Sequence, residues 1–173
     1  MRACRRSLAL GALSLTLVAC AGGVATNPST DVSARLAAVL PVSSATEAPD
    51  LDALGRYSIP QGRCGLVLWT LAAGKAVPVF QSISGGETTM KIEGTPVLLL
   101  QTGQAGEARV GIPAFQTFEA MTPSNGRVDI ETRAAWGVGF PGGAYVERGT
   151  ITLTGENGWK RVLPIAGIAG CRA

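Results

Sequence analysis

The chain has 173 residues, and its 15 lysines and arginines outnumber its 12 aspartates and glutamates. It contains no histidine, which excludes Ser-His-Asp and Cys-His catalysis and leaves the usual zinc hydrolases without their ligands. Its 23 glycines and 10 prolines are typical of a chain with many turns and many short strands.

The first residues have the features of a secretory signal peptide. Arg2, Arg5 and Arg6 form a basic head, and residues 7–19 are uncharged and mostly apolar. This apolar stretch is shorter than the ~20 residues that a membrane-spanning helix needs. The alternative, a buried core helix, leaves the basic head unexplained. The pattern therefore predicts a signal peptide over residues 1–19.

The end of this segment, Leu17-Val18-Ala19-Cys20, resembles the lipobox of bacterial lipoproteins: an aliphatic residue, two small or medium residues and a cysteine. The resemblance implies that residues 1–19 are removed and that Cys20 carries the lipid, with acyl chains such as palmitate. Each buried acyl methylene contributes about 0.8 kcal/mol, so more than one chain anchors a protein stably. Residue 21 is alanine rather than aspartate, which by the same resemblance favours the outer membrane, on its periplasmic face.

Removal of residues 1–19 changes the charge of the chain. Three of the 15 basic residues leave with the head, so the remaining 12 face 12 acidic residues. The remaining 154 residues have the length of one domain plus a tether. They are neutral and contain no run of lysine or arginine, which argues against a nucleic-acid partner.

Two cysteines remain besides the lipidated one, Cys64 and Cys171. An exported protein meets an oxidising compartment, so a remaining pair is normally a disulfide. The alternative is a reactive or metal-binding pair, but two thiols without histidine make a poor zinc site. The sequence therefore predicts a disulfide that brings the ends of the domain together, and no metal site.

Residues 20–58 have the small and polar composition of a tether between lipid and domain. Within them, residues 31–40 can form a short helix. The alternative is that the apolar side chains of this helix pack on the domain. The folded domain is expected over residues 59–173.

In that domain, short apolar or alternating segments are separated by turn residues. The clearest strand is expected at residues 127–133, where Val128, Ile130 and Thr132 alternate with charged residues. The other strands are expected at residues 64–71, 75–83, 88–93, 95–102, 109–112, 115–121, 150–154 and 159–165, with a hairpin around Glu93-Gly94. Seven to nine strands without a long amphipathic helix predict an all-β domain, a small antiparallel β-sandwich or barrel closed by the terminal disulfide.

Asn157-Gly158 is the strongest two-residue hairpin signal in the chain, because both central positions of that turn need positive φ. With these two residues as the turn, Leu153 lies opposite Val162 and shares the core face with it. Trp159 and Arg161 then lie on the opposite face, together with Leu163.

Motifs for catalysis are missing from the sequence. The sequence contains no Ser-x-x-Lys motif, and the acidic residues are spread singly along the chain. Residues 137–142 match Gly-x-Gly-x-x-Gly, but no helix is expected after them, as a phosphate-binding loop would need. The sequence therefore predicts a protein that is not an enzyme and that binds no cofactor.

Two groups of residues are candidates for contact with a partner. The first is the glycine-rich stretch 136–145, expected to be a wide loop that carries Trp136, Phe140 and Tyr145. The second is Trp159 with Arg161, because an exposed tryptophan beside an arginine resembles an interaction hot spot. The alternative for both groups is that the aromatic rings cover the core.

The sequence thus favours a membrane-anchored lipoprotein, with a β domain that faces the periplasm as a binding or envelope-structural module. Its expected partners are the membrane, through the lipid, and an envelope protein, peptidoglycan or an exogenous hydrolase. The alternative is a hydrolase inhibitor, since small β-barrel lysozyme-inhibitor lipoproteins are similar in size, signal and cysteine use.

Overall fold

The computed structural model describes residues 48–124 and 126–173. The predicted signal peptide, Cys20 and the helix expected at residues 31–40 lie outside the described residues. The strands are β1 (Leu51–Asp52), β2 (Cys64–Ala72), β3 (Lys75–Ile83), β4 (Thr88–Ile92), β5 (Thr95–Arg109), β6 (Ile112–Met121), β7 (Arg127–Phe140), β8 (Gly143–Gly155) and β9 (Lys160–Cys171). No helix in these two ranges is long and apolar enough to span a membrane.

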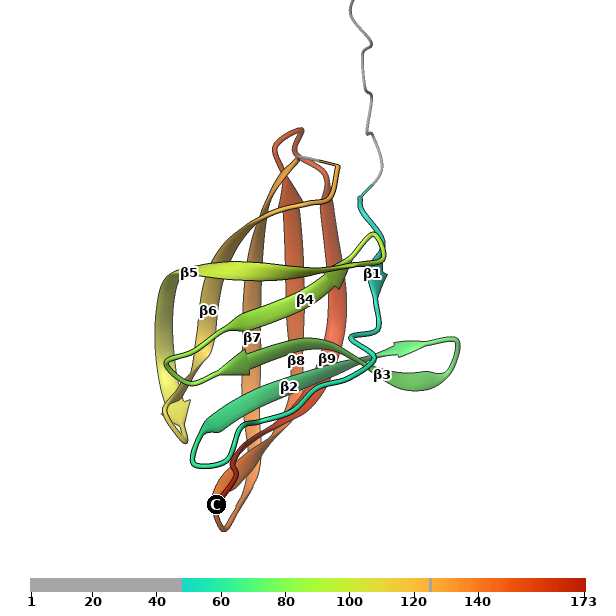
Figure 1. Cartoon of the computed structure of the whole chain (residues 1–173). Coiled ribbons are helices and arrows are strands. Elements are labelled where there is room, and N and C mark those ends of the chain that lie inside the picture. The colour runs from blue at the N-terminus through green and yellow to red at the C-terminus, as the bar shows by residue number, and fades with distance from the viewer. Residues whose placement is uncertain (1–47, 125) are drawn as a thin grey trace, which may run out of the picture. The chain divides into compact units, whose positions relative to one another are not determined.

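Strands β2 to β9 form a closed antiparallel barrel (Figure 1). Each of these eight strands pairs with the next one along the chain, and β9 returns to pair with β2. Strand β1 adds to β4, with Leu51 opposite Ile92. The all-β prediction is confirmed, and of the two architectures expected from the sequence the chain adopts the barrel.

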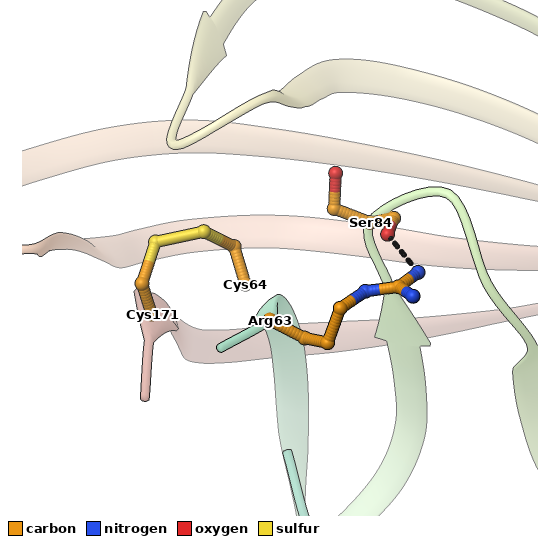
Figure 2. The surroundings of a disulfide bond; sticks show 4 residues. All are labelled: Arg63, Cys64, Ser84 and Cys171. Carbon is orange, nitrogen blue, oxygen red and sulfur yellow. Dashed lines mark hydrogen bonds between the residues drawn. A yellow bond between two sulfur atoms is a disulfide. The ribbon is translucent and has the colours of Figure 1, made fainter. Parts of the chain in front are cut away.

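The predicted disulfide joins Cys64, at the start of β2, to Cys171, at the end of β9 (Figure 2). The two cysteines are direct partners in the pairing of these strands. Beside the bridge, Arg63 Nη2 donates a hydrogen bond of 2.7 Å to the carbonyl oxygen of Ser84, between β3 and β4. The disulfide therefore lies on the seam where the first and last barrel strands meet.

Side chains fill the interior of the barrel. Phe80 and Phe118 meet there, with ring centroids 5.6 Å apart and planes at 61°. Buried polar side chains find partners inside, as in the 2.9 Å contact between the hydroxyl oxygens of Ser82 and Thr88. Among the described residues, no buried side-chain nitrogen or oxygen lacks a partner. The interior of the barrel is therefore a packed hydrophobic core in which these polar groups are paired.

Residues 53–62 cross the outer surface of β2 and β3. Leu54 N donates to the carbonyl oxygen of Pro78 at 2.8 Å, and Ser58 and Gln81 exchange two hydrogen bonds of 3.3 and 2.9 Å. Residues 48–58, whose composition resembles that of a tether, thus include the added strand β1 and a segment that covers β2 and β3. The packed region begins before residue 59.

Two glycine-rich segments that lie outside the strands expected from the sequence belong to strands. Residues 103–106 lie in β5, and residues 136–145 lie in β7 and β8 except for the turn at Pro141-Gly142. The strand pairing shifts its register at both segments, between Gln101 and Gly103 and between Trp136 and Gly139. Glycine allows such bulges and close approaches of backbone. The prediction of a wide loop at residues 136–145 is therefore wrong.

The β8–β9 hairpin differs from its predicted register by one residue. Leu153 lies opposite Arg161 rather than Val162. The reason is a three-residue turn, Glu156–Gly158, closed by a 3.1 Å hydrogen bond from Gly155 N to the carbonyl oxygen of Trp159. A shift of one residue turns every side chain of a strand to the other face. Val162 is accordingly 58% exposed.

Candidate functional site

The first group of predicted contact residues lies where β7 and β8 meet at the Pro141-Gly142 turn. Trp136 packs against the core, and its Nε1 donates to the carbonyl oxygen of Glu107 at 3.0 Å. Phe140 contacts Tyr145 with ring centroids 5.2 Å apart. Tyr145 is 52% exposed, so this end of the hairpin presents an aromatic side chain to solvent.

The second predicted group, Trp159 with Arg161, is turned toward the core side of the sheet. Trp159 packs against the core and lies over Gly155, where an added Cβ would overlap the indole ring. Arg161 Nη1 donates to the carbonyl oxygen of Pro49 at 2.9 Å and approaches Asp50 Oδ1 at 3.4 Å. Arg161 therefore fastens the chain that leads into β1. The predicted placement of these two residues on the outer face is wrong, because it depended on the two-residue turn.

These two groups do not form one surface. Phe140 pairs with Gly143 at the start of β8, whereas Trp159 packs on Gly155 at its end. The strand between them has 13 residues, or about 40 Å at the usual rise. A single partner site built from both groups is therefore excluded by the geometry of β8.

A different candidate site is a hollow on the outer wall between β5 and β6, which we call the β5–β6 groove. It has a volume of about 600 Å³, and its wall includes Pro96, Leu98, Leu100, Met121 and Pro123. The side chains of Leu98, Leu100 and Met121 are 62%, 70% and 56% exposed. Large apolar side chains gathered on one patch are typical of a surface that binds another molecule.

The groove forms because β5 changes partners along its length. Residues Thr95 to Leu99 pair with β4, and the pairing with β6 begins only at Leu100, opposite Glu119. Figure 1 shows the first half of β5 crossing the barrel while β6 continues lengthwise. The two strands therefore diverge beyond Leu100 and leave a wedge between them.

The charges beside the groove neutralise one another. Glu119 and Asp129 lie directly opposite on β6 and β7, where two carboxylates would repel. Arg127 Nη2 contacts both, at 2.8 Å from Glu119 Oε1 and 3.4 Å from Asp129 Oδ1. The wall thus presents apolar side chains next to an ion-paired rim rather than a strong field of either sign.

The described residues contain no cluster of metal-ligating side chains. No group of three or more potential ligands among cysteine, histidine, aspartate and glutamate could hold a metal ion within residues 48–124 and 126–173. A further ion pair on the outer wall joins Arg133 Nε to Glu131 Oε1 at 2.6 Å.

Sequence reasoning missed the groove, although one signal was present. The run Leu98-Leu99-Leu100 is apolar on both faces of a strand, while a barrel wall buries one face. Leu99 is 8% exposed and its two neighbours face outward. Two outward-facing leucines at alternate positions of a strand are the sequence signal of an exposed apolar patch.

Comparison with known proteins identifies no relative of this chain: no protein-family model, no curated protein and no solved structure matches it.

Proposed function

We propose that this chain is a non-enzymatic lipoprotein, held at the outer membrane through lipid on Cys20, whose barrel binds a partner in the periplasm. The anchor is inferred from the resemblance of residues 17–20 to a lipobox. The observation that supports a binding role is the β5–β6 groove. Its leucines are exposed to water, although the interior of the barrel is filled by other side chains. Burying each leucine against a partner would contribute about 1.5–3 kcal/mol, from which the entropy lost when the partners become ordered must be subtracted.

The anchor can be tested by replacing the lipidated cysteine. When the gene is expressed with a palmitate analogue that can be labelled, we expect wild-type protein to carry the label and to sediment with membranes. Cys20→Ser should lose the label and keep residues 1–19. Cys4→Ser is the matched control, because Cys4 lies in the removed segment, and it should behave as wild type. Label retained on the Cys20→Ser protein would contradict the proposal.

A second candidate function is inhibition of an exogenous hydrolase such as lysozyme. It is favoured by the β7–β8 hairpin, whose outer residues Val138 and Tyr145 are 77% and 52% exposed. The contact between Phe140 and Tyr145 holds this end in one shape, as a wedge that enters an enzyme cleft requires. In a turbidity assay on bacterial cell walls, an inhibitor should suppress lysozyme at equal molar amounts. Clearing at an unchanged rate with the protein in excess would eliminate this candidate.

A further inference from the structure

The β5–β6 groove contains a strand edge without a partner strand. In a two-residue hairpin the residues that flank the turn form a hydrogen-bonded pair, here Ile92 and Thr95 around Glu93-Gly94. Along an antiparallel ladder, hydrogen-bonded pairs alternate with pairs that exchange no hydrogen bond. Leu98 and Thr89 form a pair of the second kind, so Leu98 directs its N–H and C=O away from β4. Within the described chain, the β5–β6 pairing ends at Leu100 and Glu119, before it reaches Leu98.

The backbone groups at this edge decide between two kinds of occupant. A lipid acyl chain would bury the apolar side chains but would leave the N–H and C=O of Leu98 without partners in hydrocarbon, which is unfavourable. An extended peptide satisfies both needs, because its own backbone can pair with the edge while its side chains pack in the groove. The exposed edge beside Leu98 and Met121 therefore favours a peptide over a lipid surface.

The size of the groove also limits the occupant. The part of β5 whose outer edge lacks a partner strand, Thr95 to Leu99, is about 17 Å long at the usual rise per residue. On this edge Leu98 offers both N–H and C=O, whereas Pro96 offers only its C=O. A stable complex between two globular proteins usually buries about 800 Å² on each partner. The groove offers three exposed apolar side chains and a volume of about 600 Å³. This is less than the surface that a globular partner needs, and it matches one short segment of chain. A second copy of the barrel is thus a poorer fit than a peptide.

The charges beside the groove indicate what that segment contains. Arg127 is already paired with Glu119 and Asp129, so the rim offers no unpaired charge that would favour an acidic or a basic segment. Leu98 and Leu100 occupy alternate positions on the same face of β5. The matching segment has apolar side chains at alternate positions and no charge among them.

We propose that the β5–β6 groove binds an extended, uncharged peptide segment of a partner protein, which adds as a strand to the free edge of β5. Its apolar side chains, at alternate positions, pack on Leu98, Leu100 and Met121. This inference rests on the binding role proposed above and specifies the partner. It does not depend on the lipid anchor.

The test uses the full chain with Cys20→Ser, so that binding is measured without lipid. The probe is a phage-displayed library of random dodecapeptides, and the most enriched peptide is then synthesised with a fluorescent label. We expect enriched peptides to share apolar residues at alternate positions. Leu98→Glu should weaken binding of the labelled peptide, measured by fluorescence anisotropy, by more than about tenfold. Val162→Glu is the matched control, since Val162 is 58% exposed on β9, and it should bind as wild type.

A second measurement tests the strand pairing itself. Methylation of a peptide backbone nitrogen removes one hydrogen-bond donor. Methylation of the nitrogens that face β5 should abolish binding, whereas methylation of the nitrogens of the intervening residues, which face away from β5, should not. Equal melting temperatures of the Leu98→Glu and Val162→Glu variants would show that the loss is local. Failure of the palmitate labelling would remove the anchor and leave this result intact.

Several outcomes would overturn the peptide proposal. These are a library without enriched peptides, binding that Leu98→Glu does not weaken, or indifference to the position of the methyl groups. Binding to vesicles of phosphatidylethanolamine and phosphatidylglycerol that Leu98→Glu abolishes would assign the groove to a lipid surface instead. Concentration-dependent dimers that the same variant dissociates would assign it to a second copy of the chain.

Discussion

Replacing Phe118 with alanine is expected to lower the free energy of unfolding by about 3–5 kcal/mol. Phe118 is 1% exposed and its ring meets that of Phe80 inside the barrel. The truncation removes the contact between the rings and leaves a cavity. Because pairing between the strands holds the closed barrel in place, the wall can close over that cavity only in part.

Urea unfolding with linear extrapolation measures this loss, and thermal unfolding should show a melting temperature lower by at least about 10 °C. Val138→Ala is the control, because Val138 is 77% exposed, and it should change the free energy of unfolding by less than about 0.5 kcal/mol. A Phe118→Ala protein as stable as this control would show that Phe118 does not lie in a packed interior.

Removing the disulfide with Cys64→Ala and Cys171→Ala together is expected to lower the free energy of unfolding by about 2–5 kcal/mol. The bridge joins residues 107 positions apart, and the chain-entropy model assigns a loop of this length about 4–5 kcal/mol. In this barrel the bridge also spans the β2–β9 seam, the one strand pairing that is not a hairpin. Without the bridge, that pairing must form by closure of nearly the whole domain.

The contribution of the disulfide is measured by comparing the urea unfolding of oxidised and reduced protein. Dithiothreitol should shift the urea midpoint of the wild type to that of the double variant, since Cys171 is exposed to the reductant. The midpoint of the double variant should not respond, which controls for other effects of the reagent. Alkylation of both Cys64 and Cys171 in native protein without reductant would contradict the bridge.

Local patterns in the sequence predict much of this fold. The alternation at residues 127–133 places Val128, Ile130 and Thr132 inside, and all three are buried. The Glu93-Gly94 hairpin forms as expected, with φ of 50° and 76° at its two central residues. Both features depend on residues close together in the chain, which is why one sequence is enough to predict them.

Register and strand length are less accessible from sequence. Asn157-Gly158 satisfies a two-residue turn equally well, but the chain uses Glu156–Gly158, with positive φ only at Gly158. The choice allows Trp159 to pack on Gly155 and Leu163 to reach the core. Packing of these side chains outweighs the local preference of the turn, and no local pattern contains that contribution.

The sequence by itself determined the β class, most of the strands and their turns, and the pairing of Cys64 with Cys171. Only the tertiary structure decided that the sheet closes as a barrel, which face of β9 points inward, and that β5 leaves β6 at Leu100. The physical reason is the range of the interactions. Turns and alternation arise from neighbouring residues, whereas closure, register and the β5–β6 groove arise from contacts between strands that must first be brought together.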